Sequence, residues 1–283
     1  MYQNTPPRST IRLTRRGRLV LIATGAVVAG TAVAVPLLTL DSGESAKEPT
    51  TLLIPEGWRA GQVYDAVDKA LAQPPGTAKR SLAKAHLKLP NDAEGNPEGY
   101  LFPATYPLER NGRKTTPEAL LSFMVDTANK KFNGAPIAAG AQRNAMNVYQ
   151  AVTIASIVQA EAATKSDMAK VARVIFNRLE RGMPLQMDST INYALNRSTL
   201  KTTGADLRID SPYNSYQRMG LPPTPIDNPG EDAMRAAIAP AAGDWLYFVT
   251  VKPGDTRFTA SYEEHRRNVA EFNKNQKNAA KAD

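Results

Sequence analysis

Glu161 is the residue whose surroundings best suit proton-transfer chemistry. It ends an almost purely apolar run and, at a period of 3.6 residues, continues the stripe of Ile154, Ile157 and Val158. Burial in such a stripe disfavours the charged carboxylate, and raising a Glu pKa from about 4.3 to about 6.5 costs roughly 3 kcal/mol. A carboxyl with a pKa near neutral can serve as a general acid or base. A structural Glu paired with an Arg or with backbone donors fits the same pattern.

Other reactive side chains are scarce in this chain. Cys is absent, and His86 and His265 are the only histidines. This composition excludes disulfides, thiolate chemistry and Cys-based metal sites, and it leaves little material for a His-rich metal centre. Ser156 lies in a helical pattern without the G-x-S-x-G turn, so a nucleophilic role is not expected. We predict no metal and no other cofactor.

The net charge of +8 is concentrated at the N-terminus. The chain has 283 residues, and five arginines lie in the first eighteen without any acid. Without them the remainder carries about +3, which is ordinary, so no nucleic-acid partner is expected. The apolar and charged fractions, 42% and 22%, are those of a globular chain with one or two modest domains.

An uncharged stretch from Leu19 to Leu40 follows the arginines. At 1.5 Å per residue it spans about 33 Å, enough to cross a bilayer core. The preceding arginines predict a cytoplasmic N-terminus and an extracytoplasmic body, so we expect a single-pass cell-membrane protein. A cleaved signal peptide is the alternative, because Ala32-Val33-Ala34 resembles an A-x-A cleavage site. The apolar run continues beyond that site, which favours the anchor.

The following segment, 51–108, predicts a small mixed unit after a polar linker at residues 41–50. Its patterns indicate a strand at 51–54, helices at 60–71 and 77–87, and a strand at 99–106. Thr77 is a candidate N-cap for the second helix. Pro103 inside the last strand suggests an edge or a bulge.

Helical patterns dominate the sequence from Thr116 to Gly182. Thr116 and Pro117 are typical of a helix start. Residues 133–143 read as a small-residue connection, and Asn147 and Gln150 form a capping-box pattern before the Glu161 helix. A further helix is expected over 167–181.

The C-terminal part predicts mostly turns, a strand at 245–251, a polar helix from Tyr262 and a frayed tail at 274–283. Helices and strands interleave without a strict βαβ rhythm. We therefore predict an α+β fold.

Many short motifs in this order resemble the signature of the MltG/YceG-like endolytic murein transglycosylases. The match covers roughly residues 50 to 273, and no single motif would suffice. The matching segments are Glu98 to Tyr106, Ala155 to Glu161, Phe176 to Leu179, Gly182 to Thr190, Ser211 to Tyr216, Gly220 to Pro223, Pro225 to Gly230, Tyr247 to Val249 and Phe258 to His265.

The resemblance implies a domain order and a partner. It implies a cytoplasmic segment (1–18), a transmembrane helix (19–40), a linker (41–50), a LysM-like module (51–108), a mixed α+β catalytic domain (109–273) and a tail (274–283). Proteins of this family cut nascent peptidoglycan strands internally. Cell-wall synthases are therefore the candidate protein partners.

The resemblance places the catalytic acid at Glu161. Many members carry another Glu where this chain has Gln159, so here Glu161 is the only acid able to fill the role. Other members have Pro where this chain has Ser189, which leaves the shape of that turn open.

A lytic mechanism would need one such carboxyl. The acid protonates the glycosidic oxygen between N-acetylmuramic acid and N-acetylglucosamine, and its carboxylate then deprotonates the muramic C6 hydroxyl, which closes a 1,6-anhydro ring. Hydrolysis would ordinarily use a second carboxylate about 5 to 9 Å away. An exported peptidoglycan hydrolase and a non-catalytic glycan-binding scaffold remain as alternatives.

The candidate substrate-binding residues are Gln186, Asp188, Tyr213, Asn214 and Tyr216. Tyrosines can stack on sugar faces and Asn can bond acetamido groups, although ordinary packing is the competing interpretation. Asp188 fits a helix N-cap or substrate positioning better than direct chemistry.

Two further charged residues have structural expectations. Arg178 is expected to pair with a buried acid, with Glu161 as one candidate. Glu98 is expected in a structural salt bridge.

Overall fold

The computed structural model describes residues 50–110, 112–199 and 202–282. The predicted cytoplasmic segment, the Leu19–Leu40 anchor and nearly all of the linker lie outside these residues. Within the described ranges, no helix has both the length and the apolar character needed to cross a bilayer.

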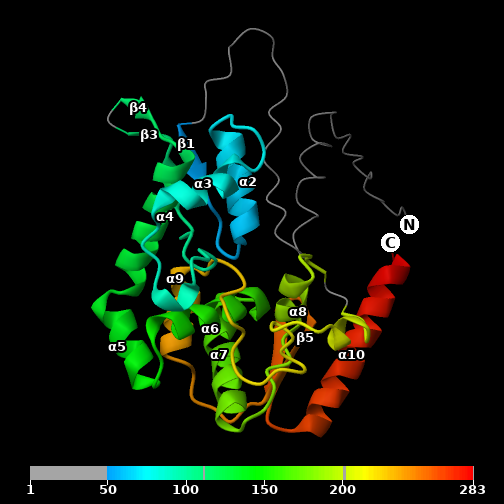
Figure 1. Ribbon diagram of the computed structural model, residues 1–283. Helices are drawn as coiled ribbons and strands as arrows, with labels where there is room; N and C mark the ends of the chain where they lie inside the picture. Colours follow the sequence, from blue (N-terminus) through cyan, green and yellow to red (C-terminus); the bar gives the residue numbers. More distant parts are fainter. Residues whose placement is uncertain (1–49, 111, 200–201, 283) are drawn as a thin grey trace, which may run out of the picture. The chain divides into compact units, whose positions relative to one another are not determined.

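The described chain combines α-helices with three two-stranded antiparallel sheets, which confirms the α+β prediction (Figure 1). The strands are β1 (Thr51–Leu53), β2 (Thr105–Pro107), β3 (Glu109–Arg110), β4 (Arg113–Lys114), β5 (Tyr247–Lys252) and β6 (Asp255–Thr259). The helices are α2 (Ala60–Ala70), α3 (Thr77–Ala85), α4 (Pro117–Phe132), α5 (Ala135–Arg143), α6 (Val148–Glu161), α7 (Lys165–Glu180), α8 (Asp188–Ala194), α9 (Glu231–Ile238) and α10 (Tyr262–Ala282).

The N-terminal segment, residues 51–108, has the order strand–helix–helix–strand. β1 pairs with β2 in antiparallel register, with Leu52 opposite Tyr106. Both helix predictions are confirmed, but Gly76 rather than Thr77 is the N-cap of α3. The Thr77 hydroxyl instead donates to the Pro74 carbonyl at 2.6 Å.

The predicted strand at 99–106 is wrong for most of its length. Gly99 has φ +85°, a left-handed conformation that interrupts an extended chain. The Leu101 amide donates to the buried Asn228 side chain at 2.8 Å instead of to a neighbouring strand. Tyr100 and Phe102 are buried in this irregular loop, so their strand-like composition reflects core packing rather than pairing.

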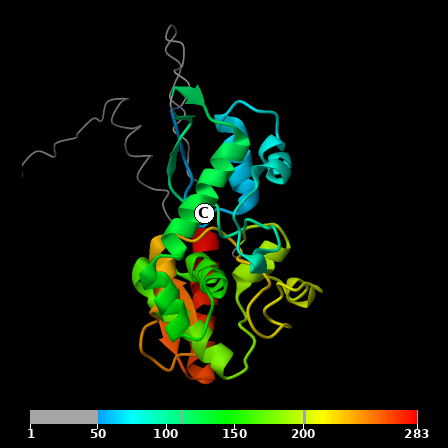
Figure 2. The same cartoon turned by 60° about the vertical axis from the view of Figure 1, so that its left-hand side comes forward.

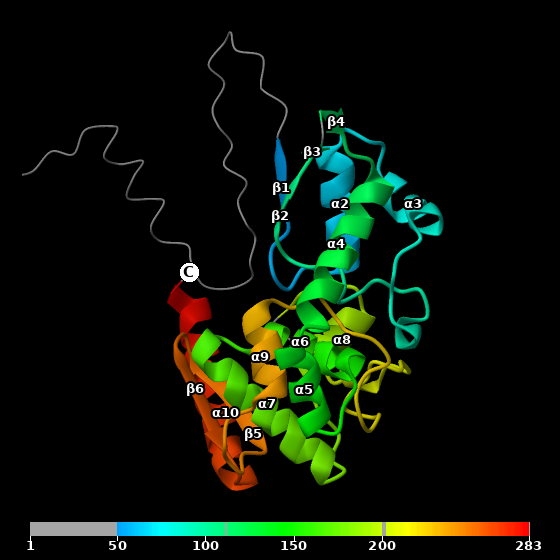
Figure 3. The same ribbon diagram turned by 90° about the vertical axis from the view of Figure 1, so that its left-hand side faces the viewer.

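α6 is the central helix and carries Glu161 at its last position. It contacts α5, α7, α8 and α9 (Figure 3). The predicted capping box is confirmed: Asn147 Oδ1 accepts from the Gln150 amide at 2.9 Å, and Gln150 Oε1 accepts from the Asn147 amide at 3.0 Å. Ile154, Ile157 and Val158 are fully buried, which confirms the apolar stripe leading to Glu161.

Several elements occur where the sequence predicted none or predicted turns, and α5, β6 and α9 are among them. α5 replaces the expected connection at 133–143, β6 completes a hairpin with β5, and α9 follows Gly230 with two acids in its first turn. β5 and β6 pack against α10 (Figure 2). α10 continues to Ala282, and the Asn275 side chain donates to the Val251 carbonyl at 2.8 Å, so the structure shows helix over residues 274–282, where the sequence predicted a frayed tail.

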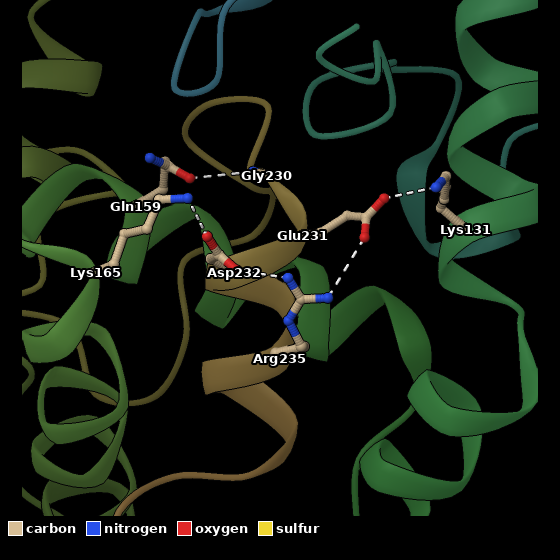
Figure 4. Close-up of polar contacts among 7 residues, drawn as sticks. All are labelled: Lys131, Gln159, Lys165, Gly230, Glu231, Asp232 and Arg235. Atoms are coloured by element: carbon tan, nitrogen blue, oxygen red, sulfur yellow. Dashed lines mark hydrogen bonds and ion pairs between the residues drawn. The ribbon is translucent and has the colours of Figure 1, made fainter.

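Polar contacts at the start of α9 fix it against three other helices (Figure 4). Lys131 of α4 bonds Glu231 at 2.6 Å, and Lys165 of α7 bonds Asp232 at 2.5 Å. From α6, Gln159 Oε1 accepts the Gly230 amide at 3.1 Å. Two residues correspond to about 200° around a helix, so Gln159 and Glu161 leave α6 in nearly opposite directions.

We predict that Gly140→Ala lowers stability although Ala is the better helix former. A Cβ at Gly140 of α5 would lie 2.7 Å from the Ile238 Cβ on α9, so the two helices would have to separate. Overpacking of this kind typically costs about 1–3 kcal/mol. Gly61→Ala is the control, because nothing lies within 4 Å of a Cβ there. That variant should gain up to about 1 kcal/mol in a urea or thermal unfolding experiment. Equal effects of the two changes would contradict the close approach of α5 and α9.

Candidate active site

A groove of about 740 Å³ runs past the end of α6, and Glu161 lies on its wall. The groove is lined by side chains from α6, α7, the segment before α8, the loop at 211–216, β5 and α10. The polar and aromatic residues among them include Glu161, Arg178, Gln186, Asp188, Tyr216, Tyr247 and His265.

The Glu161 carboxyl is half-buried and meets one backbone donor, because its Oε1 accepts from the Ser189 amide of α8 at 3.0 Å. Burial of the carboxyl raises the pKa of Glu161 above its ordinary value. Hydrogen bonding by Ser189 opposes that rise, and the negative charge of Asp188 adds to it. The side chain therefore favours its protonated form more strongly than a solvated Glu does.

Asp188 lies beside Glu161 in the groove and is held by Tyr216. The Tyr216 hydroxyl donates to Asp188 Oδ1 at 2.5 Å. Burial raises the pKa of Tyr216, so the phenol remains a donor at neutral pH. Met187, not Asp188, is the N-cap of α8, which corrects the N-cap expectation.

Arg178 does not pair with Glu161. Its buried guanidinium donates to the carbonyls of Leu246, Pro184 and Leu185 at 2.7–3.0 Å and to Gln186 Oε1 at 2.9 Å. It also lies 5.0 Å from the ring centroid of Tyr247. Arg178 thus holds together the segment before α8 and the start of β5. Gln186 is exposed at the groove, with a left-handed backbone at φ +55°.

The two remaining candidate residues lie away from the groove. Asn214 is fully buried, and its amide nitrogen donates to the carbonyls of Leu207 and Ile209 while its oxygen accepts from the Tyr216 amide. Its side chain therefore shapes the loop that carries Tyr216. Tyr213 bonds Thr224 at 2.8 Å and packs on Tyr193 with ring centroids 4.8 Å apart.

Sequence reasoning assigned no site role to three groups at the groove, although two of them, Tyr247 and His265, lie in motif segments of the family resemblance. The Ser189 amide is a backbone group, and no side-chain pattern signals it. Tyr247 stacks on His265 at 5.0 Å, and both lie far along the chain from Glu161. Burial, followed by the charge of Arg178, lowers the pKa of His265, which favours the neutral imidazole.

Two other residues singled out in the sequence have structural contacts. The Ser156 hydroxyl is buried, donates to the Thr153 carbonyl and accepts from the Ile226 amide. Glu98, expected in a salt bridge, accepts its hydrogen bonds from the neutral donors Ala60, Tyr193 and Asn228. Across the described ranges, no three His, Cys or acidic side chains gather to hold a metal.

We predict that Asp188→Asn lowers the pKa of Glu161. The variant removes the neighbouring negative charge that disfavours ionisation of Glu161 and keeps an oxygen that can accept from Tyr216. The measurement is a ¹³C NMR titration of the Glu161 carboxyl. Asp126→Asn is the control, since Asp126 is an exposed acid on α4. An unchanged or higher pKa in Asp188→Asn would contradict this description of the groove.

The chain is similar to YceG-like proteins and to endolytic murein transglycosylases. The sequence model of the YceG-like family matches residues 29–271. An endolytic murein transglycosylase of Bacillus subtilis is 39% identical over 170 residues, which cover 60% of this chain and 46% of that protein. One of Streptococcus pneumoniae serotype 2 is 36% identical over 248 residues, covering 78% of this chain and 44% of that protein.

A solved structure is also similar. The crystal structure of a yceG-like protein from Listeria monocytogenes aligns with a TM-score of 0.66 and 32% identity, covering 77% of this chain and 75% of that one. This chain spans less than half the length of the two named transglycosylases. The family match covers well over half of the present sequence, and the chain therefore belongs to the YceG-like family.

Proposed function

We propose that this protein is an endolytic lytic transglycosylase that cleaves the β-1,4 bond between N-acetylmuramic acid and N-acetylglucosamine in peptidoglycan strands. The observation that carries the proposal is the setting of Glu161, a half-buried carboxyl with a raised pKa on the wall of a groove. The names of the Bacillus and Streptococcus relatives support the substrate class. No cofactor enters the proposed reaction.

Glu161 acts first as an acid and then as a base in this mechanism. Its protonated carboxyl donates to the glycosidic oxygen as the bond to the muramic C1 breaks. The carboxylate then removes the proton from the muramic C6 hydroxyl, whose oxygen bonds to C1 and leaves a 1,6-anhydro end. Proton transfer by one positioned group typically contributes about 10²- to 10⁴-fold to the rate, and it is most effective when its pKa lies near the ambient pH.

The neighbouring side chains have proposed positioning roles. Gln186, Asp188 and Tyr216 line the groove and can bond or stack against the sugars. Asn214 acts by shaping the loop that presents Tyr216, and Tyr213 acts by packing on Tyr193 of α8.

Peptidoglycan hydrolysis is the competing function, and the presence of Asp188 in the same groove favours it. A hydrolase would use the second carboxylate to activate water or to attack C1. Asp188 is held by the Tyr216 hydroxyl at 2.5 Å, an arrangement that fits a positioning group. The products distinguish the two reactions, because hydrolysis leaves an end heavier by one water molecule.

Anchoring belongs to the proposal as well. The sequence from Leu19 to Leu40 and the arginines before it support a single membrane span with the body outside the cytoplasm. The strand–helix–helix–strand order of residues 51–107 supports a LysM-like module, placed between the anchor and the groove-bearing part. Cell-wall synthases working on the same nascent strands are the candidate partners.

We predict that Glu161→Gln releases no 1,6-anhydro ends from uncrosslinked glycan strands, a loss of at least about 100-fold. Mass spectrometry of the products measures this. Burial raises the pKa of Glu161 in the folded state above its value in the unfolded state. The folded protein therefore loses stability from this group as the pH rises from the unfolded-state pKa to the folded-state pKa. The variant should therefore melt no lower than the parent at neutral pH.

Moving the acid along α6 gives a sharper control. Gln159→Glu keeps an acceptor for the Gly230 amide and should stay active. The double variant Gln159→Glu with Glu161→Gln has the parent's composition of acids but points the carboxyl to the opposite side of α6, so it should be inactive. Activity in the double variant, or undiminished anhydro ends from Glu161→Gln, would refute the assignment.

The anchor yields a separate prediction. The full chain should sediment with membranes after cell lysis, whereas a chain starting at residue 41 should stay in the supernatant. Ultracentrifugation followed by immunoblotting tests this. Sedimentation of both forms alike would show that residues 1–40 are not what attaches the protein to the membrane.

A further inference from the structure

α8 is a short helix whose first turn touches Glu161. With seven residues it is about 10 Å long. The amide of its second residue, Ser189, supplies the hydrogen bond to Glu161 Oε1 at 3.0 Å. Any movement of α8 along its axis or about its far end therefore changes the surroundings of that carboxyl.

The far end of α8 is held by Arg59, the N-cap residue of α2. Its guanidinium donates to the Asn192 carbonyl at 3.3 Å and to the Arg197 carbonyl at 3.0 Å. Carbonyls at a helix C-terminus lack partners within the helix, and a cation there is favourable. The guanidinium also lies 5.3 Å from the ring centroid of Tyr193. Arg59 of the N-terminal segment thus supplies hydrogen-bond donors to the C-terminal end of α8, more than 130 residues later in the chain.

A second contact joins the same two parts of the chain. The Tyr193 hydroxyl donates to Glu98 Oε2 at 3.2 Å, and Glu98 Oε1 accepts from the Ala60 amide at 2.8 Å. Glu98 is only 4% exposed. Burial raises its pKa to about 7. Arg59 therefore holds the backbone of the C-terminal turn of α8, and Glu98 holds the Tyr193 side chain of the same turn.

We propose that Arg59, acting with Glu98 through Tyr193, is a positioning residue that keeps α8 where the Ser189 amide meets the Glu161 carboxyl. The proposal rests on the proposed function for its effect on turnover. The bond between Ser189 and Glu161 itself is a property of the fold and can be measured without substrate. The N-terminal segment thus contributes to the reaction by setting the geometry of the catalytic acid.

Hydrogen bonding by Ser189 favours the carboxylate and lowers the pKa of Glu161, so loss of this donor alone raises that pKa. Release of α8 also moves Asp188, whose charge raises the pKa, and changes the burial of the carboxyl, so the pKa departs from that of the parent. The activity limb that requires protonated Glu161 moves together with this pKa. Asp188, Tyr216, Arg178, Tyr247, Tyr262, His265 and Arg266 are the other ionisable groups that line the groove, and none of them is changed in the test variants.

The experiment compares three substitutions by ¹³C NMR titration of the Glu161 carboxyl and by the pH profile of anhydro-end release. Arg59→Met removes the guanidinium and keeps an apolar stem. Ser189→Pro removes both donors of Ser189, the backbone amide and the hydroxyl, at a position in the first helical turn, where Pro is tolerated. Arg80→Met is the matched control, an exposed arginine of the same N-terminal segment whose guanidinium donates to Pro75 and Thr77.

We expect Ser189→Pro to shift the Glu161 titration and the alkaline limb of activity upward, and Arg59→Met to move both together away from the parent's values. We also expect kcat at the pH optimum to fall by about tenfold in Arg59→Met while KM stays within about twofold, because the carboxyl is less well positioned. Arg80→Met should match the parent in every measurement. A role of Arg59 in stability alone would lower the melting temperature and leave the Glu161 pKa unchanged, which would overturn the proposal.

Tyr193→Phe keeps the ring and removes only the hydroxyl bond to Glu98, so it covers the case in which Arg59→Met does not fold. It should shift the titration in the same direction by a smaller amount. An unshifted titration in Tyr193→Phe would then overturn the proposal. If the parent releases no anhydro ends, the proposed function fails, but the NMR comparison still tests the positioning role.

Discussion

The Glu161 carboxyl is held between two opposing influences at the end of α6. The apolar residues that bury α6 also desolvate its last side chain, which favours the neutral acid. One backbone amide from α8 favours the carboxylate. In the proposed mechanism this group first gives a proton and later takes one, and in this chain the two influences shift its pKa in opposite directions. Arg178 and Tyr216 hold the segment at the start of α8, which carries this amide, beside the end of α6.

Arg178 shows how the fold preserves that balance. A guanidinium paired with Glu161 would stabilise the carboxylate and remove the acid. The structure directs the Arg178 donors to three carbonyls and to the Gln186 amide oxygen instead. The neighbouring charge that acts on Glu161 is the negative charge of Asp188, which raises the pKa of Glu161 further. On the opposite face of α6, Gln159 has a structural role, because its side-chain oxygen accepts the Gly230 amide at the start of α9.

Local patterns in the sequence were enough to predict the elements that obey local rules. The capping box at Asn147 and Gln150 and the buried stripe before Glu161 depend on neighbours three or four residues away, and both are confirmed. α5 and α9 were missed because short Ala-rich stretches resemble connections, and their stability comes from packing on other helices: α5 meets α9 at Gly140 and Ile238, and α9 also packs on α6 and α7. The partners of Arg178 and Asn214 are mostly backbone carbonyls brought together by the fold, for which a sequence carries no side-chain signal.

The distance along the chain between the parts of this site has a physical consequence. Glu161 lies in α6, its amide donor in α8, and the residues that hold α8 in a segment that ends before residue 109. A single apolar cluster includes residues of that segment and of α6, so the two cannot separate without exposing core side chains to water. Loss of the N-terminal segment would therefore expose apolar surface and also leave the carbonyls at the end of α8 without their cation. A chain shortened to the groove-bearing part alone would keep Glu161 but lose the contacts that determine where its hydrogen-bond donor lies.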